Sequence, residues 1–310
     1  MPTIPKEVRE IATQYHMSID YINHLSNFLD TLEISKILKL GPSNIKTTIR
    51  FNLMKSNQSE TVAKLRAENI SVKAIGGIPE AFEVIKGKNK IGHSLTYLSG
   101  EIMPQGYGSM LSVHILDPLP NETILDLSAA PGGKSCFIGE RMRGKGVLIA
   151  NEYSHSRAKS LINNLSRHGI SNSVVTIQEG SKFTYPSKFD KILLDAPCSG
   201  DGLIVSQPNV RPKKTLENSY ILQRVQQSLL KHAISLLKPD GICVYSTCSL
   251  NTIENEEVIQ PFLNKIQIEN IPSPGIPGNK DIHDDFYKTT RLLPSKLGCD
   301  GFFIAKLRKI

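Results

Sequence analysis

Short apolar runs alternate with longer amphipathic stretches through the last two thirds of the chain. The apolar runs predict buried strands at residues 123–129, 146–152, 173–179, 189–197 and 241–249. Residues 156–169 and 220–238 lie between these runs and carry apolar side chains at helical spacing. Because alternating strands and helices form a parallel sheet covered by helices, residues 113–310 are predicted to form an α/β domain with a mostly parallel, doubly wound sheet. The ligand of such a sheet binds at the carboxyl ends of its strands.

The first 43 residues have a different, helical pattern. Ser18 is a candidate N-cap, and apolar residues follow it at helical spacing. These apolar positions are Ile22, Leu25, Phe28, Leu29 and Leu32. Gly41 and Pro42 end the pattern. We expect residues 1–43 to form a helical packing segment.

Residues 44–112 are predicted to form a small α+β module. β-branched alternation predicts strands at residues 44–55, 71–77 and 81–87, with a helix at 59–70. The module is rich in basic side chains, which are Lys46, Arg50, Lys55, Lys64, Arg66, Lys73, Lys86, Lys88 and Lys90. Such a cluster either lines a phosphate-binding face or is an ordinary solvated surface, and the sequence leaves both open. Near the other end, the Pro/Gly-rich residues 271–280 predict a long loop.

Composition narrows the class of protein. Hydrophobic residues make up 39% of the chain and charged residues 21%, as in a globular protein. The net charge of +8 favours a polyanionic partner such as nucleic acid, although many proteins are mildly basic. The N-terminus lacks the apolar core of a signal peptide, and no apolar run is long enough for a membrane helix. The five cysteines form no C-x-x-C pair, so we expect no metal site and a reducing, cytoplasmic location.

A glycine turn follows the first predicted strand of the α/β domain. Gly132 and Gly133 let the backbone approach a ligand, and the next helix presents free N–H groups there. Glu152 ends the second strand, where an acidic residue can bind both hydroxyls of a ribose. A surface carboxylate would occupy the same position without that role. The turn is neither a dinucleotide G-x-G-x-x-G nor a Walker A loop, which leaves an adenosine ligand of another kind.

Two cysteines occur at the ends of later strands. DAPCSGDG spans residues 195–202 and contains Cys198, and STCS spans residues 246–249 and contains Cys248. A lone buried cysteine is usually a small core residue. Because both motifs follow apolar strands, we expect both thiols at the sheet edge that carries the glycine turn. Two thiols at one edge favour an active site.

The motifs around the glycine turn and the two cysteines resemble those of a known family. LDLSAAPGGK, LLDAPCSGDG and VYSTCSL are similar to signatures of the RNA cytosine-C5 methyltransferases, the Sun-domain enzymes of tRNA and rRNA. RFNLMK, GEIMPQGYGSM, NEYSHSR, IENEEV and CDGFFIAKLRK resemble further blocks of that family, so the resemblance covers nearly the whole chain after about residue 40. It implies a Rossmann-like class-I methyltransferase fold, S-adenosylmethionine as the cofactor and RNA as the substrate. With RNA as the substrate, residues 44–112 are expected to be an RRM-like, RNA-binding module.

The resemblance also implies roles for individual residues. Cys248 matches the nucleophile, Cys198 the second cysteine, and Asp195 an aspartate that faces both cofactor and cytosine. The cofactor-binding loop corresponds to Ser128, Ala129, Ala130, Pro131, Gly132, Gly133 and Lys134. Glu152 matches the ribose-binding acid and Arg157 an arginine five positions on, while Glu179 stands where the family usually has Asp near the adenine.

The sequence departs from the family pattern in places. Ser128 replaces a frequent Cys, Glu152 and Glu179 replace Asp, and the usual aromatic residue after DAPCSGDG is absent. The DNA enzymes use a cysteine after proline as the nucleophile, which would select Cys198. The STCS motif resembles the RNA enzymes, in which the later cysteine attacks, so we assign Cys248.

The implied chemistry is covalent catalysis. Thiolate addition at cytosine C6 activates C5 for methylation, which divides one difficult step into easier ones. The target base must be unstacked to reach the site. We favour tRNA over rRNA as the substrate. The alternatives are an rRNA enzyme, another class-I methyltransferase, and a non-catalytic RNA-binding factor on the same fold, which the fold alone would not separate.

Overall fold

The computed structural model describes residues 4–310, which form two compact units. The cysteine unit, named for Cys198 and Cys248, contains the described residues up to 45 with 196–231 and 246–307. The glycine-loop unit, named for the turn after the first strand of its parallel sheet, contains residues 46–195, 232–245 and 308–310. The sequence predicts domain boundaries after residues 43 and 112, which differ from the boundaries of these two units, and the predicted domains stay a prediction.

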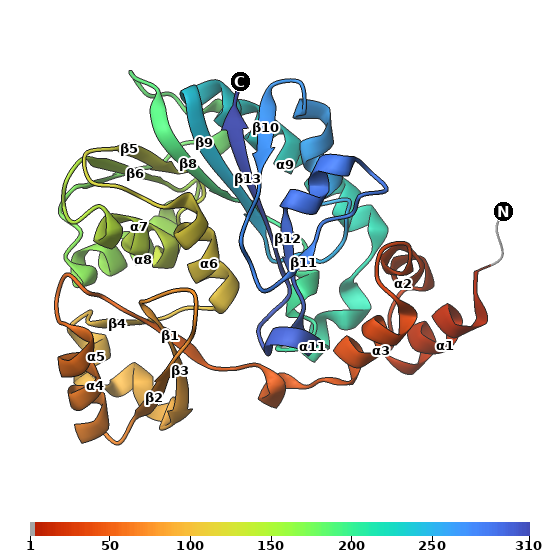
Figure 1. Ribbon diagram of the computed structural model, residues 1–310, viewed down its shortest axis with the longest axis horizontal. Coiled ribbons are helices and arrows are strands. Elements are labelled where there is room, and N and C mark those ends of the chain that lie inside the picture. The colour runs from red at the N-terminus through yellow and green to blue at the C-terminus, as the bar shows by residue number, and fades with distance from the viewer. Residues whose placement is uncertain (1–3) are drawn as a thin grey trace. The chain divides into compact units, whose positions relative to one another are not determined.

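A parallel sheet forms the core of the glycine-loop unit. Its strands are β5 (Thr123–Asp126), β6 (Val147–Asn151), β7 (Ser173–Thr176), β8 (Phe189–Asp195) and β9 (Leu237–Thr247), and β9 ends in the other unit. They lie in the order β9-β8-β5-β6-β7, and β5 pairs in parallel with both β6 and β8. Helices α7 (Gly133–Arg141) and α8 (His155–His168) lie side by side against these strands, as Figure 1 shows. Each predicted strand of the α/β domain is present, and the predicted mostly parallel sheet is confirmed.

A second, antiparallel sheet of the same unit contains the basic segment. The strands β1 (Thr48–Phe51), β2 (Ser71–Ala74), β3 (Ala81–Lys86) and β4 (Ile102–Pro104) lie in the order β2-β3-β1-β4. Helices α4 (Gln58–Ala67) and α5 (Leu95–Leu98) accompany it. Strand β4 was not predicted, since three residues ending in proline give little signal. A proline is tolerated there because β4 is an edge strand.

Arg50 fastens this small sheet to the parallel sheet's helices. Its side chain is fully buried, and its guanidinium lies 2.9 Å from a carboxylate oxygen of Glu140 on α7. His168 at the end of α8 contacts the same oxygen at 3.0 Å, and burial lowers the pKa of its imidazole. Of the basic residues in this segment, Arg50 is therefore structural rather than part of a phosphate-binding face. Helix α6 (Tyr107–Leu116) links the two sheets along the chain.

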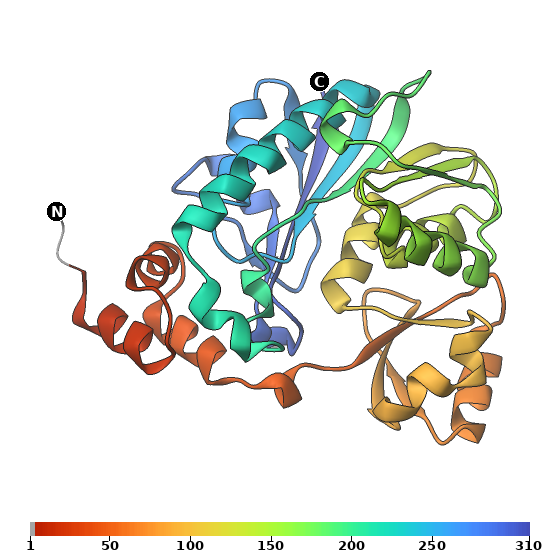
Figure 2. The same ribbon diagram turned by 180° about the vertical axis from the view of Figure 1, so that it is seen from behind.

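The cysteine unit begins with three short helices, visible as a consecutive group in Figure 2. They are α1 (Lys6–Gln14), α2 (Ile19–Ser26) and α3 (Thr31–Lys39). Ser18 caps α2 as predicted, with its hydroxyl accepting from Tyr21 N. Leu32 does not share the buried face, because the chain turns and Asp30 caps a new helix; its side chain is 68% exposed.

Short strands and one long helix complete the cysteine unit. Helix α9 (Leu216–Leu236) begins in this unit, and α10 (Glu256–Ile259) and α11 (Pro294–Leu297) are single turns. Strand β12 (Thr290–Leu292) pairs antiparallel with β11 (Ile276–Pro277) and β13 (Phe302–Lys309), and β10 (Ile266–Glu269) also pairs with β13. The loop predicted at residues 271–280 thus contains a two-residue strand. Among the helices of residues 4–310, none combines the length and the apolar character needed to cross a membrane.

Candidate active site

The glycine turn connects β5 to α7 in a conformation that requires glycine. Gly132 has a φ of +106° and precedes the first residue of α7. Its left-handed backbone angle strains any larger residue, and a Cβ would come within 3.1 Å of the Leu161 side chain, which would have to shift. At Gly133 the nearest atom to a Cβ would be 3.8 Å away, on Gln105. The first amides of α7, which have no acceptor within the helix itself, therefore lie at this turn.

Glu152 and Arg157 converge on this turn. Glu152 is 4% exposed at the end of β6, and its carboxylate accepts from Ala130 N at 3.3 Å and from Ser154 N at 3.0 Å. Arg157 donates to Ala130 O at 3.0 Å and lies 3.5 Å from the Glu152 carboxylate. The structure thus brings together the loop and two of the residues predicted to bind the cofactor.

Two aspartates lie at the ends of neighbouring strands. Asp126, at the end of β5, is buried, and burial raises the pKa of its carboxyl to about 6 although Ser135 donates to it at 2.7 Å. Asp195, at the end of β8, accepts from Lys134 Nζ at 2.7 Å. Lys134, the last residue of the predicted loop, therefore fixes the position of the Asp195 carboxylate.

Glu179 lies apart from these contacts. Its carboxylate accepts from Ser181 at 2.7 Å and from Lys182 at 2.9 Å, and the Lys182 hydrogen bond lowers its pKa. These partners are its immediate neighbours in the chain and do not belong to the glycine turn. An adenine contact by Glu179 stays a prediction.

The five cysteines differ in their access to solvent. All are free, and Cys136, Cys243 and Cys299 are buried, whereas Cys198 and Cys248 are partly exposed. Burial raises the pKa of Cys136 and of Cys243 to about 12, which disfavours the nucleophilic thiolate. The Sγ atoms of Cys198 and Cys248 lie 2.8 Å apart. The two motif cysteines therefore form a pair of adjacent thiols with access to a substrate.

Glu254 contacts both of the chain segments that carry the thiol pair. The carboxylate is fully buried and accepts from Ser199 N at 2.8 Å, next to Cys198. It also accepts from Asn251 Nδ2 at 2.8 Å, three residues after Cys248. Glu254 was not singled out from sequence, although it lies in the IENEEV block. Its position shortly after the STCS motif is the feature of the sequence that could have indicated a role for Glu254 at this site.

Asp201 provides a second tie between the two cysteine segments. It lies in the DAPCSGDG motif, is fully buried, and accepts from Leu250 N and from Asn251 Nδ2, the latter at 2.8 Å. The Tyr21 hydroxyl of α2 also donates to it, and burial beside this carboxylate raises the pKa of Tyr21 well above its usual value. The N-terminal helices thus help to position the thiol pair.

Comparison with known proteins identifies the family. A family model described as 16S rRNA methyltransferase RsmB/F matches residues 113–308, more than half of the chain. The chain belongs to this family. Its members depend on S-adenosylmethionine, so the predicted family and cofactor are confirmed.

Named relatives of this methyltransferase family act on two kinds of RNA. The chain is 35% identical to the 25S rRNA (cytosine-C(5))-methyltransferase nop2 of Schizosaccharomyces pombe, over 98% of this chain and 52% of that protein. It is 35% identical to the tRNA (cytosine(49)-C(5))-methyltransferase of Pyrococcus abyssi, over 86% of this chain and 88% of that protein. The chain thus spans about half the length of the yeast relative.

Solved structures agree with the family assignment. A methyltransferase homologue from Pyrococcus horikoshii superposes with a TM-score of 0.88 at 28% identity, covering 99% of this chain and 100% of that chain. A second match, titled as the crystal structure of PH0851, has a TM-score of 0.86 at 29% identity, with 99% and 69% coverage. The class-I methyltransferase fold is therefore confirmed.

The geometry at Glu152 leads to a prediction for this family member. Glu152→Ala is expected to weaken S-adenosylmethionine binding by about 1.5–3 kcal/mol, because a charged acceptor beside the glycine turn is lost. This corresponds to roughly a tenfold to hundredfold higher Kd in calorimetry. Glu10→Ala, an exposed change on α1, is the control. Unchanged affinity in a Glu152→Ala protein that melts like the wild type would remove Glu152 from the cofactor site.

Proposed function

We propose that this protein is a tRNA cytosine-C5 methyltransferase with Cys248 as its nucleophile. The observation that carries the proposal is the thiol pair. Of the five cysteines, the two that are partly exposed are those of DAPCSGDG and STCS, and their sulfur atoms lie 2.8 Å apart. A reaction that uses one thiol to attack and a second to assist release requires this arrangement.

The residues around the glycine turn fit an adenosine cofactor with a charged tail. The turn gives close backbone access, the N-terminus of α7 favours a carboxylate, and Glu152 provides an acceptor for ribose hydroxyls. We assign cofactor binding to residues 128–134, Glu152 and Arg157. Bound S-adenosylmethionine supplies an electrophilic methyl group for cytosine C5.

The chain's own residues prepare the cytosine for this methyl group. The Cys248 thiolate forms a bond to C6, and the electrons of the C5–C6 double bond make C5 nucleophilic. After methylation, C5 loses its proton, the double bond reforms and the Cys248–C6 bond breaks. We assign Cys198 to assistance in this release, because its sulfur is adjacent to the leaving sulfur.

Asp195 is assigned to recognition of the base. A carboxylate that Lys134 holds at 2.7 Å has a fixed orientation, and a carboxylate is the acceptor that the exocyclic amino group of cytosine requires. Hydrogen bonding at the base edge stabilises the charge that the thiolate addition redistributes. The same aspartate lies beside the cofactor-binding residues through Lys134.

The choice of tRNA rests on the similarity to a tRNA enzyme. The chain is 35% identical to the tRNA (cytosine(49)-C(5))-methyltransferase of Pyrococcus abyssi over 86% of this chain. An rRNA substrate is the second candidate, because the family description and several relatives name rRNA. Bisulfite sequencing of tRNA and rRNA incubated with protein and S-adenosylmethionine tests both. New 5-methylcytosine in rRNA alone would favour the rRNA proposal over the tRNA proposal. Absence of new 5-methylcytosine from both RNAs would favour a non-catalytic RNA-binding factor.

A cytosolic location stays a prediction.

We propose that the small antiparallel sheet contributes to RNA binding through its exposed lysines. Lys86, Lys88 and Lys90 are exposed next to one another at the end of β3. Replacing all three by alanine is expected to weaken RNA binding and to lower the salt dependence of affinity by about 0.7–0.9 per lost phosphate contact. Fluorescence anisotropy at several salt concentrations measures both quantities.

The control for this variant is a triple replacement of equal charge elsewhere. Lys6, Lys36 and Lys39 are exposed on the N-terminal helices, and their replacement by alanine should change RNA binding less. An affinity and a salt dependence that respond equally to both triple variants would contradict a specific role for the β3 lysines.

A further inference from the structure

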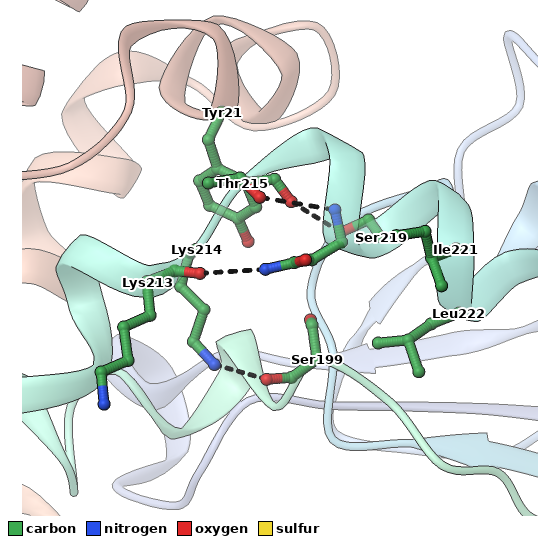
Figure 3. A pocket seen from close by; sticks show the side chains of 9 residues that line it. Tyr21, Ser199, Lys213, Lys214, Thr215, Ser219, Ile221 and Leu222 are labelled. Atoms are coloured by element: carbon green, nitrogen blue, oxygen red, sulfur yellow. Dashed lines mark hydrogen bonds between the residues drawn. The ribbon is translucent and has the colours of Figure 1, made fainter.

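A pocket of the cysteine unit lies directly beside the thiol pair. It has a volume of about 410 Å³, within the range of roughly 300–1,000 Å³ typical of ligand sites. Ser199, the residue after Cys198, forms part of its wall, and Figure 3 shows Lys214 and Ser199 meeting there. Its lining comes from Tyr21, Ser199, Lys213, Lys214, Thr215, Asn218, Ser219, Ile221 and Leu222. None of the roles assigned above to the catalytic residues uses this pocket.

Lys214 is a buried cation without an acidic partner. The residue is 8% exposed, and its ammonium donates to the carbonyl oxygen of Ser199. Within residues 4–310, no carboxylate lies within 4.0 Å of Lys214 Nζ. A buried charge that lacks a counter-ion destabilises a fold, and a bound anion would supply the missing counter-charge to Lys214.

Three further groups of the pocket favour an anion. Lys213 is exposed at its edge and also has no carboxylate within 4.0 Å among the described residues. The buried Ser199 hydroxyl has no hydrogen-bond partner in the part of the chain that the structure describes. Thr215 precedes α9 and Asn218 lies in its first turn, and they add a hydroxyl and a side-chain amide to the lining, while the backbone amides of Asn218 and Ser219 already donate to Thr215.

We propose that this pocket binds one backbone phosphate of the RNA, next to the cytosine that enters the thiol site. The inference deepens the proposed function and rests on it. Cys198 and Ser199 are consecutive, so an RNA whose cytosine reaches the thiol pair passes the pocket with its neighbouring phosphate. The two lysines and the Ser199 hydroxyl then supply charge and a donor. Ile221 and Leu222 provide an apolar wall for the adjoining sugar.

The first test measures RNA binding without catalysis. In the full chain, Lys213→Ala and Lys214→Ala are compared with Lys231→Ala, which removes an exposed cation of α9 outside the pocket. Each pocket variant should reduce the salt slope of binding to single-stranded RNA by about 0.7, and the control should reduce it less. Lys214→Arg should restore the slope, because it keeps the charge. Equal slopes for the pocket variants and Lys231→Ala would overturn the proposal.

Because Lys214 is buried, its replacement could destabilise the fold. Thermal melting checks that the variant is folded, and the exposed Lys213 can be replaced without this risk.

The second test removes the phosphate instead of the lysine. An RNA with one neutral methylphosphonate beside the methylated cytosine should lower kcat/KM of the wild type by about tenfold to a hundredfold. The same RNA should lower kcat/KM of the Lys213→Ala and Lys214→Ala variants much less. An equal loss in wild type and variants would mean that the pocket does not contact this phosphate.

Free phosphate is the other source of the same chemistry. If millimolar inorganic phosphate raises the melting temperature through Lys214 while the methylphosphonate RNA behaves as normal RNA, the pocket is a free-phosphate site and the RNA proposal is wrong. The experiments distinguish failure of the proposed methyltransferase function from failure of the phosphate site. A wild type that binds RNA with the pocket-dependent slope but methylates none would overturn the proposed function alone. Methylation with unchanged slopes and no methylphosphonate effect would overturn the phosphate site alone.

Discussion

Cys198→Ala protein incubated with substrate RNA and S-adenosylmethionine is expected to accumulate a covalent protein–RNA complex. Cys248 can still form its bond to C6 and methylation can proceed, but the release that we assign to Cys198 is blocked. The product then stays attached through Cys248. A denaturing gel should show a slowly migrating band that contains both protein and RNA and that disappears in the Cys198→Ala/Cys248→Ala double variant.

Cys248→Ala is expected to abolish methylation and to form no covalent complex. Removal of the nucleophile leaves C5 unactivated, so the loss should reach at least about a thousandfold, as for other catalytic nucleophiles. Cys243→Ala is the matched control, because Cys243 is a buried cysteine of β9 whose raised pKa excludes it from nucleophilic chemistry. Its replacement should leave complex formation and turnover in place.

The outcomes separate three mechanisms. A trapped complex in Cys248→Ala and none in Cys198→Ala would exchange the two roles and match the DNA-type assignment. Methylation retained in both variants, without any complex, would overturn covalent catalysis. The 2.8 Å separation of the sulfur atoms is compatible with either order of attack, so the distribution of trapped product decides between them.

The parallel sheet was predictable from sequence because its strands are buried on both faces. Residues such as Ile124, Leu148 and Ile192 are fully buried, so β5, β6 and β8 appear as continuous apolar runs. Strands β4 and β11 were not predictable in this way. Each is two or three residues long and contains a proline, and the pairing that defines it comes from distant strands.

Some residues of the candidate site could be predicted from sequence and others could not. Motif residues such as Gly132 and Cys248 were recognisable because local backbone demands or chemistry restrict the residue type. Glu254 and Lys214 were not, since their roles depend on partners brought together by folding. Glu254 contacts the segments of both cysteines, and Lys214 is an ordinary basic residue in sequence that becomes a buried cation in a pocket.

Arg50 shows the same limit for the basic segment. In the sequence it is one of a series of cations, and charge alone suggests a phosphate contact. Tertiary packing instead pairs it with Glu140 at 2.9 Å and places it 4.6 Å over the ring of Phe137. Only the exposed lysines and the exposed Arg66 of that segment therefore remain candidates for RNA contact.

The largest stability effect is expected at Arg291, whose side chain is 1% exposed in the cysteine unit. Its guanidinium donates to both carboxylate oxygens of Glu256, at 2.8 and 2.7 Å, and its Nε donates to Leu250 O at 2.9 Å. Arg291→Met is expected to lower the free energy of unfolding by about 3–5 kcal/mol, because it leaves the Glu256 charge buried and unpaired. Urea unfolding of both proteins measures the difference.

A double variant distinguishes loss of the ion pair from loss of packing. If the unpaired charge dominates, Arg291→Met/Glu256→Met should be more stable than Arg291→Met, since replacing a buried ion pair by apolar groups costs little. The exposed pair of Lys6 and Glu10, 3.6 Å apart, is the control, and Glu10→Gln should change stability by less than about 1 kcal/mol. A double variant as unstable as the sum of its single changes would contradict the charge argument. In that case the hydrogen bond to Leu250 O, two residues after Cys248, would be the main contribution, and methylation should fall in parallel with stability.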